Sequence, residues 1–353
     1  IKNGVRAKGL IPVFVSKTFP NHYSIATGMY AENHGLIGNH FYDAELDDNF
    51  TLSDRSKVKD PKFYGGEPIW VTAEKQGLKT ASYFWVGTEA PIGGSYPSKW
   101  KKYEQNFPFE ARIDSIVSWF SLPINERPRF CSLYFHEPDW TGHETGPRSQ
   151  ETEAVVSHLD SLFGDLISKL EQLPISKYLN IIAVADHGMA EISSERTVDL
   201  SAYTDMSQII QEGSGPYAFL YSKRKNIIEP AVDQLKKAEH ISVYLKSDIP
   251  ERFHFKNHHR IKDALIIADE GWYIQNQAIS SSSTAGEYVP TGGTHGYDNQ
   301  LKSMHALFIA QGPAFKNDIV TEPFENVNIY PMIAHILGID PSQKIDGNLN
   351  NIK

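Results

Sequence analysis

The sequence predicts an α/β fold of three layers, in which a mainly parallel sheet is covered by helices on both faces. Short apolar runs alternate along the chain with segments of helical periodicity, an order typical of parallel sheets with helical connections. The run Asn180–Ala185 is apolar on both faces, as a strand inside such a sheet requires. The 353 residues suffice for a large core, and large α/β chains often fold as one body with an inserted lobe.

The elements of this sheet can be placed in order. Strands are expected at Leu10–Val15, Thr80–Val86, Phe130–Phe135, Asn180–Ala185 and Ala306–Ala310. Helices are expected from Pro20 to Met29, at Phe109–Phe120, at Glu151–Leu173 and at Val327–Leu337. Pro12 is tolerable only near the start of the first strand, because proline cannot donate to a sheet. Pro20 suits the first turn of the helix that follows, and Gly338 ends the last helix.

Residues 191–290 differ in character from the rest of the chain. They hold several short candidate strands, at Tyr217–Tyr221, Ile241–Leu245 and Ala264–Asp269, and a polar, Ser-rich stretch at Ile279–Thr284 that is expected to be a mobile loop. We therefore predict an inserted lobe at 191–290 and a catalytic core formed by 1–190 and 291–353.

The composition limits the partners of the chain. Its formal net charge is −9, and its basic clusters, Lys99–Lys102 and Lys223–Lys225, are too short to follow a nucleic-acid backbone. No apolar run has the length of a membrane span. Cys131 is the only cysteine, which excludes an intrachain disulfide and a multi-cysteine zinc site. A small phosphate compound held by metal ions remains as a substrate, and the sequence specifies no oligomeric state.

Candidate functional residues follow three of the predicted strands. Thr18 lies at a strand-to-helix junction, where backbone N–H groups and the helix dipole favour an anion. Asp139 and Asp186 also follow apolar strands. Because ligands bind at the carboxyl ends of parallel strands, we expect these three side chains to share one site.

The residues around these positions have the types of metal ligands. Asp139-Trp-Thr-Gly-His143 places a carboxylate and an imidazole four residues apart, Asp186-His187 places them side by side, and His295 lies in a Gly-rich loop. Mixed histidine and carboxylate ligation suits Zn²⁺. By contrast, His254, His258 and His259 are expected in a solvated basic loop, and His22 and His34 in structural or capping roles.

Longer motifs carry a family resemblance. Lys17-Thr-Phe-Pro-Asn-His-Tyr-Ser-Ile-Ala-Thr-Gly-Met-Tyr30, followed by Glu32-Asn-His-Gly35 and Gly38-Asn39, resembles the signature of nucleotide pyrophosphatase/phosphodiesterases, members of the alkaline phosphatase superfamily. Later segments resemble further family blocks in the same order, namely Pro108–Arg112, Glu137–His143, Asp186–Met189 and Gly293–Tyr297. The resemblance covers nearly the whole chain and implies an alkaline-phosphatase-like fold.

The resemblance also implies roles for individual residues. Thr18 would be the nucleophile and would bridge two Zn²⁺ ions. Asp186 and His187 would hold the metal nearer the nucleophile, and the other metal would be held by Asp139, His143 and His295. Asn39 would donate its amide to a phosphoryl oxygen. The substrate would be contacted by an aromatic set: Phe19 and Tyr103 on both faces of the nucleobase, Tyr134 lining the pocket and Trp85 beside the base.

These roles imply zinc-dependent hydrolysis of nucleotide phosphodiester or pyrophosphate bonds through a phosphothreonine, with release of a nucleoside monophosphate. Two alternatives on the same scaffold stay open: a phosphomonoesterase or phospholipid-headgroup phosphodiesterase, and a catalytically impaired binding homologue. The retained Thr18 and Asn39 argue against impairment, whereas a metal-binding Asp of the family that this chain lacks argues for it.

The chain departs from the family pattern at one position. The family has a further metal-binding Asp, in an Asp-Gly pair ending a core strand, upstream of the position of Ile1. We therefore expect the natural protein to extend upstream with that strand and an export signal. The lack of disulfides favours an exported bacterial enzyme over an animal one.

Overall fold

The computed structural model describes residues 3–224, 226–275 and 291–352. Its first central sheet has the strand order β18-β1-β17-β8, from Ile319–Thr321, Gly4–Ala7, Phe308–Gln311 and Ile181–Val184. β1 runs parallel to β18, whereas β17 is antiparallel to both of its neighbours. The predicted α/β class is confirmed, with an antiparallel strand inside a sheet that was expected to be mainly parallel.

A second central sheet is entirely parallel. β5 (Thr80–Tyr83) pairs on one side with β6 (Lys99–Lys101) and on the other with β7 (Phe130–Leu133). The strands expected at Thr80–Val86 and Phe130–Phe135 therefore end two or three residues earlier than predicted. The side chains beyond their ends, including Trp85 and Tyr134, are free to turn toward the functional site.

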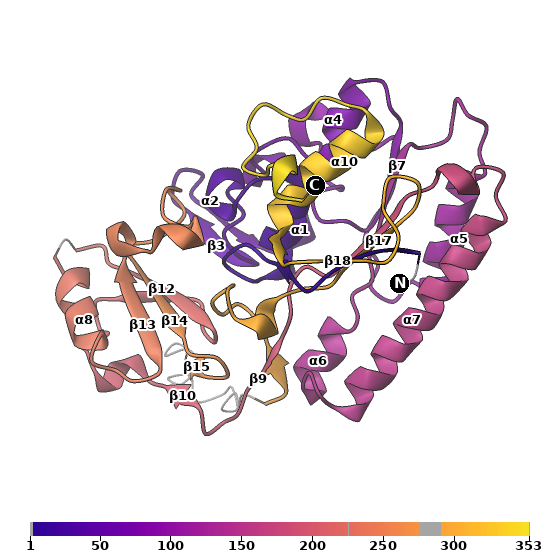
Figure 1. The fold of residues 1–353 in the computed structure, drawn as a ribbon. Coiled ribbons are helices and arrows are strands. Elements are labelled where there is room, and N and C mark those ends of the chain that lie inside the picture. The colour runs from indigo at the N-terminus through magenta and orange to yellow at the C-terminus, as the bar shows by residue number, and fades with distance from the viewer. Residues whose placement is uncertain (1–2, 225, 276–290, 353) are drawn as a thin grey trace.

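Helices cover these sheets in two groups (Figure 1). α5 (Phe109–Phe120) and α7 (Gln150–Glu171) lie side by side and share an apolar cluster with β5, in which Ile113 and Leu162 are buried. α1 (Thr18–Thr27) contacts α2 (Ala31–His34), α4 (Ile69–Lys75) and α10 (Ile329–Leu337). The helix expected from Val327 begins at Ile329, after a short 3-10 turn.

The first predicted strand is much shorter than expected. Only Leu10–Ile11 form a strand, β2, which pairs with β19 (Phe324–Glu325). Pro12 ends the pairing, and the side chain of Asn21 then replaces a neighbouring strand. Its Oδ1 accepts from Val13 N at 2.7 Å, and its Nδ2 donates to Val15 O at 3.0 Å. The buried segment that leads into Thr18 is therefore held by an amide side chain.

The strand before Asp186 is less buried than its composition suggested. β8 was expected to be buried on both faces, yet each residue of Ile181–Val184 is partly exposed. The physical reason is that β8 pairs with β17 alone among the strands of the described residues. The apolar pattern thus predicted the strand correctly.

Residues 191–290 contain a second body of structure, drawn in orange at the left of Figure 1. Its antiparallel sheet has the order β11-β12-β14-β13, from Ile210–Glu212, Tyr217–Tyr221, Ala264–Ala268 and Ile241–Leu245, and it carries α8 (Ile228–Leu235). Its apolar cluster includes Leu220, Val232 and Ile266. The Ser-rich segment Ile279–Thr284 lies outside the described residues.

Several short pairs of strands complete the fold. β9 (Ala190–Glu191) pairs with β16 (Gly293–Thr294), and β10 (Thr197–Val198) pairs with β15 (Tyr273–Ile274). β3 (His40–Asp43) and β4 (Asp48–Thr51) form a hairpin, which α3 (Arg55–Val58) follows. Phe14 packs between Phe253 and Phe255 at ring separations of 4.5 and 5.1 Å. None of the helices described is long and apolar enough to cross a membrane.

Candidate active site

Three of the predicted metal ligands meet at one point. Asp139 and His143 lie four residues apart on α6 (Asp139–Thr145), and His295 follows β16. Asp139 Oδ1 lies 3.5 Å from His143 Nε2 and 3.6 Å from His295 Nε2, and the two Nε2 atoms are 3.1 Å apart. Among the described residues, Asp139, His143 and His295 form a group whose ligand atoms lie close enough to one another to bind one metal ion.

The hydrogen bonds of these side chains fit a bound cation. His143 Nδ1 donates to Gly293 O at 2.8 Å, and His295 Nδ1 donates to Ser16 O at 2.7 Å, which orients both Nε2 atoms toward Asp139. Burial, together with the charge of His187, holds the pKa of His295 well below its usual value, so this ring is neutral. The two Nε2 atoms and the carboxylate oxygen lie close enough to coordinate one cation. Zn²⁺–N distances of about 2.0–2.1 Å are compatible with this separation.

The same conclusion follows from an unsatisfied atom. Asp139 Oδ1 is buried and has no hydrogen-bond partner in the described structure. A buried carboxylate oxygen without a partner is costly in free energy. Metal coordination would satisfy it.

The second predicted pair lies directly beside this group. The His187 and His295 rings are stacked, with centroids 3.5 Å apart. Asp186 Oδ2 lies 3.0 Å from His187 Nε2. Burial alone would raise the pKa of Asp186, but His187 and His22 hold it well below its usual value. Burial alone would likewise lower the pKa of His187, but the charge of Asp186 raises it. The pair therefore presents a carboxylate and an imidazole at one point.

Thr18 is positioned at the junction of these groups. It is the first residue of α1, and its Oγ1 lies 3.4 Å from His187 Nε2. Asn39 Oδ1 accepts from Phe19 N at 2.9 Å, which fixes the orientation of the Asn39 amide. Asn39 Nδ2 is left without a partner among the described side chains and backbone groups. The arrangement places a hydroxyl, a helix N-terminus and a free amide N–H₂ together.

Sequence reasoning missed two residues of this site. His22, which was assigned a structural role, lies with Nδ1 3.0 Å from Thr18 O and 3.3 Å from Asp186 Oδ2. Its position four residues after Thr18 on one helix was a signal that it shares that face. Lys17 packs against Gly296, where a Cβ would lie 2.6 Å from Lys17 Cε. Burial lowers the pKa of Lys17 to about 8, although the charge of Asp139 raises it.

The predicted substrate-binding aromatics are only partly brought together. Tyr134 and Trp85 lie on either side of His22, at ring separations of 5.2 and 4.9 Å, and Trp85 Nε1 donates to His22 O. Tyr103 lies 6.3 Å from Tyr134. Phe19 is instead buried in the core, where it packs edge-on against Phe50. Placement of Phe19 and Tyr103 on the two faces of a base stays a prediction.

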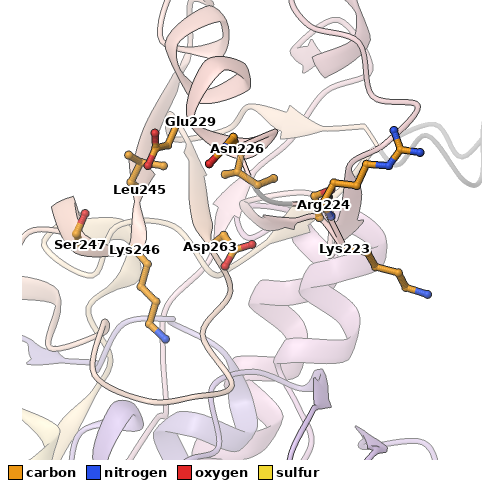
Figure 2. A pocket seen from close by; sticks show the side chains of 10 residues that line it. Lys223, Arg224, Asn226, Glu229, Leu245, Lys246, Ser247 and Asp263 are labelled. Carbon is orange, nitrogen blue, oxygen red and sulfur yellow. Dashed lines mark hydrogen bonds between the residues drawn. The ribbon is translucent and has the colours of Figure 1, made fainter.

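Other candidate regions lie apart from this site. His254 is stacked on Tyr30, and His259 contacts Asp43, as a structural loop would. A cavity of about 610 Å³ lies within residues 191–290, near the start of α8, and no predicted site residue lines it. Figure 2 shows that Lys223 and Arg224, two of its three basic side chains, point away from Glu229 and Asp263.

A threonine, carboxylates and imidazoles gathered beyond the strands of a mixed α/β sheet define the class of alkaline-phosphatase-like proteins. The chain belongs to the type I phosphodiesterase/nucleotide pyrophosphatase family, which it matches over residues 1–298. In structure it is similar to mouse ectonucleotide pyrophosphatase/phosphodiesterase 5, with a TM-score of 0.91 and 33% identity, over 99% of this chain and 91% of that chain. A second mouse structure, with a TM-score of 0.90, is a threonine-to-alanine variant described as inactive, in complex with AMP.

Curated relatives extend this result. A venom phosphodiesterase of Naja atra is 39% identical over 361 residues, which cover 99% of this chain and 42% of that protein. Ectonucleotide pyrophosphatase/phosphodiesterase family member 3 of Rattus norvegicus is 36% identical, over 99% of this chain and 40% of that protein. The chain thus spans about two fifths of the length of these relatives.

The expectation of a bacterial source is not supported, because these relatives come from snakes and mammals. That expectation rested on the lack of disulfides. Because the chain covers only about two fifths of these relatives, its single cysteine does not distinguish a bacterial protein from an animal one.

Proposed function

We propose that this chain hydrolyses nucleotide phosphodiester or pyrophosphate bonds through a phosphothreonine at Thr18 and releases a nucleoside monophosphate. The observation that carries the proposal is the approach of Thr18 to two adjoining groups of carboxylates and imidazoles, in a chain of this family. The AMP complex of the mouse relative supports a nucleotide as the substrate.

Two Zn²⁺ ions fit these groups. One would be held by Asp139, His143 and His295, and the other by Asp186, His187 and the oxygen of Thr18. When bound, they would lower the pKa of the Thr18 hydroxyl and offset negative charge on the phosphoryl oxygens. Neutral imidazoles are needed for this ligation, and the neutral state of His295 meets that need.

The chain's own residues would carry the reaction. Thr18 Oγ1 forms a bond to phosphorus while the bond from phosphorus to the leaving oxygen breaks. The N-terminus of α1 stabilises the negative charge that develops beside Thr18. Asn39 Nδ2, held in place by the bond from Phe19 N to Asn39 Oδ1, donates to a phosphoryl oxygen. Water then attacks the phosphothreonine, which restores the hydroxyl and releases the monophosphate.

The substrate base would lie on the side of His22. Tyr103 contacts Tyr134, and Tyr134 and Trp85 both contact His22; stacking of a base on such rings contributes about 1–3 kcal/mol per base. Phe19 and Tyr103 are proposed to lie on the two faces of the base. Residues 191–290 would be an inserted lobe on a core of 1–190 and 291–353, and their own sheet and apolar cluster support that division. Export of the protein is proposed from its similarity to venom and ectonucleotide enzymes.

Hydrolysis of three chromogenic esters tests the proposal against its alternatives. p-Nitrophenyl thymidine 5′-phosphate should be cleaved faster than p-nitrophenyl phosphate or p-nitrophenyl phosphorylcholine. A preference for the monoester would favour a phosphomonoesterase, and a preference for the phosphorylcholine ester a headgroup phosphodiesterase. Protein that contains zinc and binds AMP but turns over none of them would be a binding homologue.

A further inference from the structure

Trp140 is a large exposed aromatic residue beside the metal-binding group. It follows Asp139 directly on α6, and 53% of its surface is exposed. Its indole makes no hydrogen bond and no ring contact with the residues that the structure describes. An exposed tryptophan at this position is unusual for the surface of a folded chain, because burying the indole would remove a large apolar area from water.

The rest of α6 is fixed, so the exposure of Trp140 does not follow from a loose helix. Asp139 and His143 face His295 on the inner side. Gly142 is buried against Met189, where a Cβ would lie 2.7 Å from Met189 Sδ. Thr141 N and Oγ1 both donate to the carboxylate of Glu137. These contacts hold the helix in one orientation, in which Trp140 is exposed directly after the ligand Asp139.

The two halves of the site differ in exposure. Side-chain exposure is 37% for Asp139 and 38% for His143, but 17% for Asp186 and 3% for His187. Thr18 approaches the buried half, through His187. In phosphoryl transfer the attacking and leaving oxygens lie roughly in line on opposite sides of phosphorus. A leaving group displaced by Thr18 would therefore depart toward the open half, next to which Trp140 lies.

We propose that Trp140 binds the leaving group by stacking on an aromatic ring of it, such as the second base of a dinucleotide. This inference rests on the proposed function. Tyr134 contacts His22 and Tyr103, whereas Trp140 follows Asp139 on α6 and has no ring contact with this group among the described residues. A substrate with a nucleoside at each end of its phosphate bridge would contact one aromatic group with each base. Trp140 would then determine specificity for dinucleotides without taking part in the bond changes.

The test compares two substrates that transfer the same group. Diadenosine pyrophosphate and ATP both transfer AMP to Thr18. The leaving group is AMP, which carries a base, for diadenosine pyrophosphate, and pyrophosphate, which carries none, for ATP. Trp140→Ala should raise KM for diadenosine pyrophosphate about 5- to 50-fold, with little change in kcat, and should change KM for ATP less than about twofold. Trp140→Phe should restore most of the affinity, because a ring remains.

A control variant and two contrary outcomes complete the design. Tyr178→Ala removes another exposed aromatic, 68% exposed and in contact with Lys177, and should leave both substrates unaffected. Equal losses on both substrates, or no loss on diadenosine pyrophosphate, would overturn the role of Trp140 while the proposed function stands. Wild-type protein that hydrolyses neither substrate would overturn the proposed function and this inference with it.

Discussion

Arg260 Nε donates a hydrogen bond of 2.6 Å to Asp43 Oδ2, and both side chains are buried. Arg260 lies in residues 191–290 and Asp43 ends β3 of the core, so this ion pair joins the two bodies of the chain. Arg260 Nη1 also donates to Gly35 O and Phe63 O, at 2.6 and 2.8 Å. The guanidinium therefore ties the loop before β14 to three separate positions of the core, at Gly35, Asp43 and Phe63.

Removal of one partner of this pair should destabilise the fold. Asp43→Asn leaves Arg260 as a buried charge without its carboxylate, and we expect a loss of about 3–5 kcal/mol in the free energy of unfolding. Urea denaturation followed by circular dichroism measures it. Glu45→Gln is the matched control, because Glu45 is 71% exposed and contacts only the partly exposed His259. Losses of equal size in both variants would contradict the assignment of a buried anchor.

The ionisation of Asp43 should make the free energy of unfolding depend on pH. Burial alone would raise the pKa of Asp43, but hydrogen bonds from Arg260, Leu46 N–H and His259 lower it to about 2, from 3.8. A group with a lowered pKa in the folded state contributes stability above its unfolded pKa and loses it as pH falls. The stability difference between wild type and Asp43→Asn should therefore shrink between about pH 4 and pH 2. A difference that stays constant over this interval would contradict the ion pair as its source.

Replacement of Thr18 tests the nucleophile. Thr18→Ala should abolish turnover of p-nitrophenyl thymidine 5′-phosphate and leave most of the metal in place, because the carboxylate and imidazole ligands remain. Thr18→Ser keeps a hydroxyl and should retain part of the activity. The checks are the rate at a fixed protein concentration and zinc content by elemental analysis. Turnover at the wild-type rate in Thr18→Ala would exclude this residue as the nucleophile.

Metal content tests the ligand groups. His143→Ala should reduce bound zinc from about two ions per chain to about one, since the group on α6 loses one of its three protein ligands. His254→Ala should leave the zinc content unchanged, because His254 is stacked on Tyr30 away from the site. Chelators should inactivate the wild-type protein, and Zn²⁺ should restore it. Full activity of metal-free protein would disprove the two-metal proposal.

The aromatic group beside His22 gives a further prediction. Tyr103→Ala should raise KM for nucleotide esters much more than for bis(p-nitrophenyl) phosphate, which has no base to stack. Phe19→Ala is a different case, because the ring is buried against Phe50. We expect it to lower stability by about 3–5 kcal/mol, as large-to-small changes in a core do. If Tyr103→Ala weakens both substrates equally, Tyr103 supports the fold and does not bind a base.

The features that were predicted correctly from the sequence are local elements of secondary structure. Amphipathic periodicity placed α5 at Phe109–Phe120, and short apolar runs placed β12 and β13 at the bounds that the structure has. The order of residues also indicated that Asp139 and His143 follow a strand, four residues apart, whereas the helix that carries them, α6, was not predicted. Each of these features depends on residues within a few positions of one another, so the order of residue types was sufficient.

Tertiary structure decided the contacts between distant segments. Asn21 shortens β2 because its amide occupies the positions of a neighbouring strand. His22 contacts Asp186, and Arg260 meets Asp43, across stretches whose relative placement no local pattern encodes. Phe19, next to the nucleophile in sequence, packs into the core, and Trp140, next to a ligand, stays exposed. One of these aromatic residues is buried and the other exposed, because the packing of whole helices and strands, and not the chemistry of a single side chain, determines which face of an element is buried.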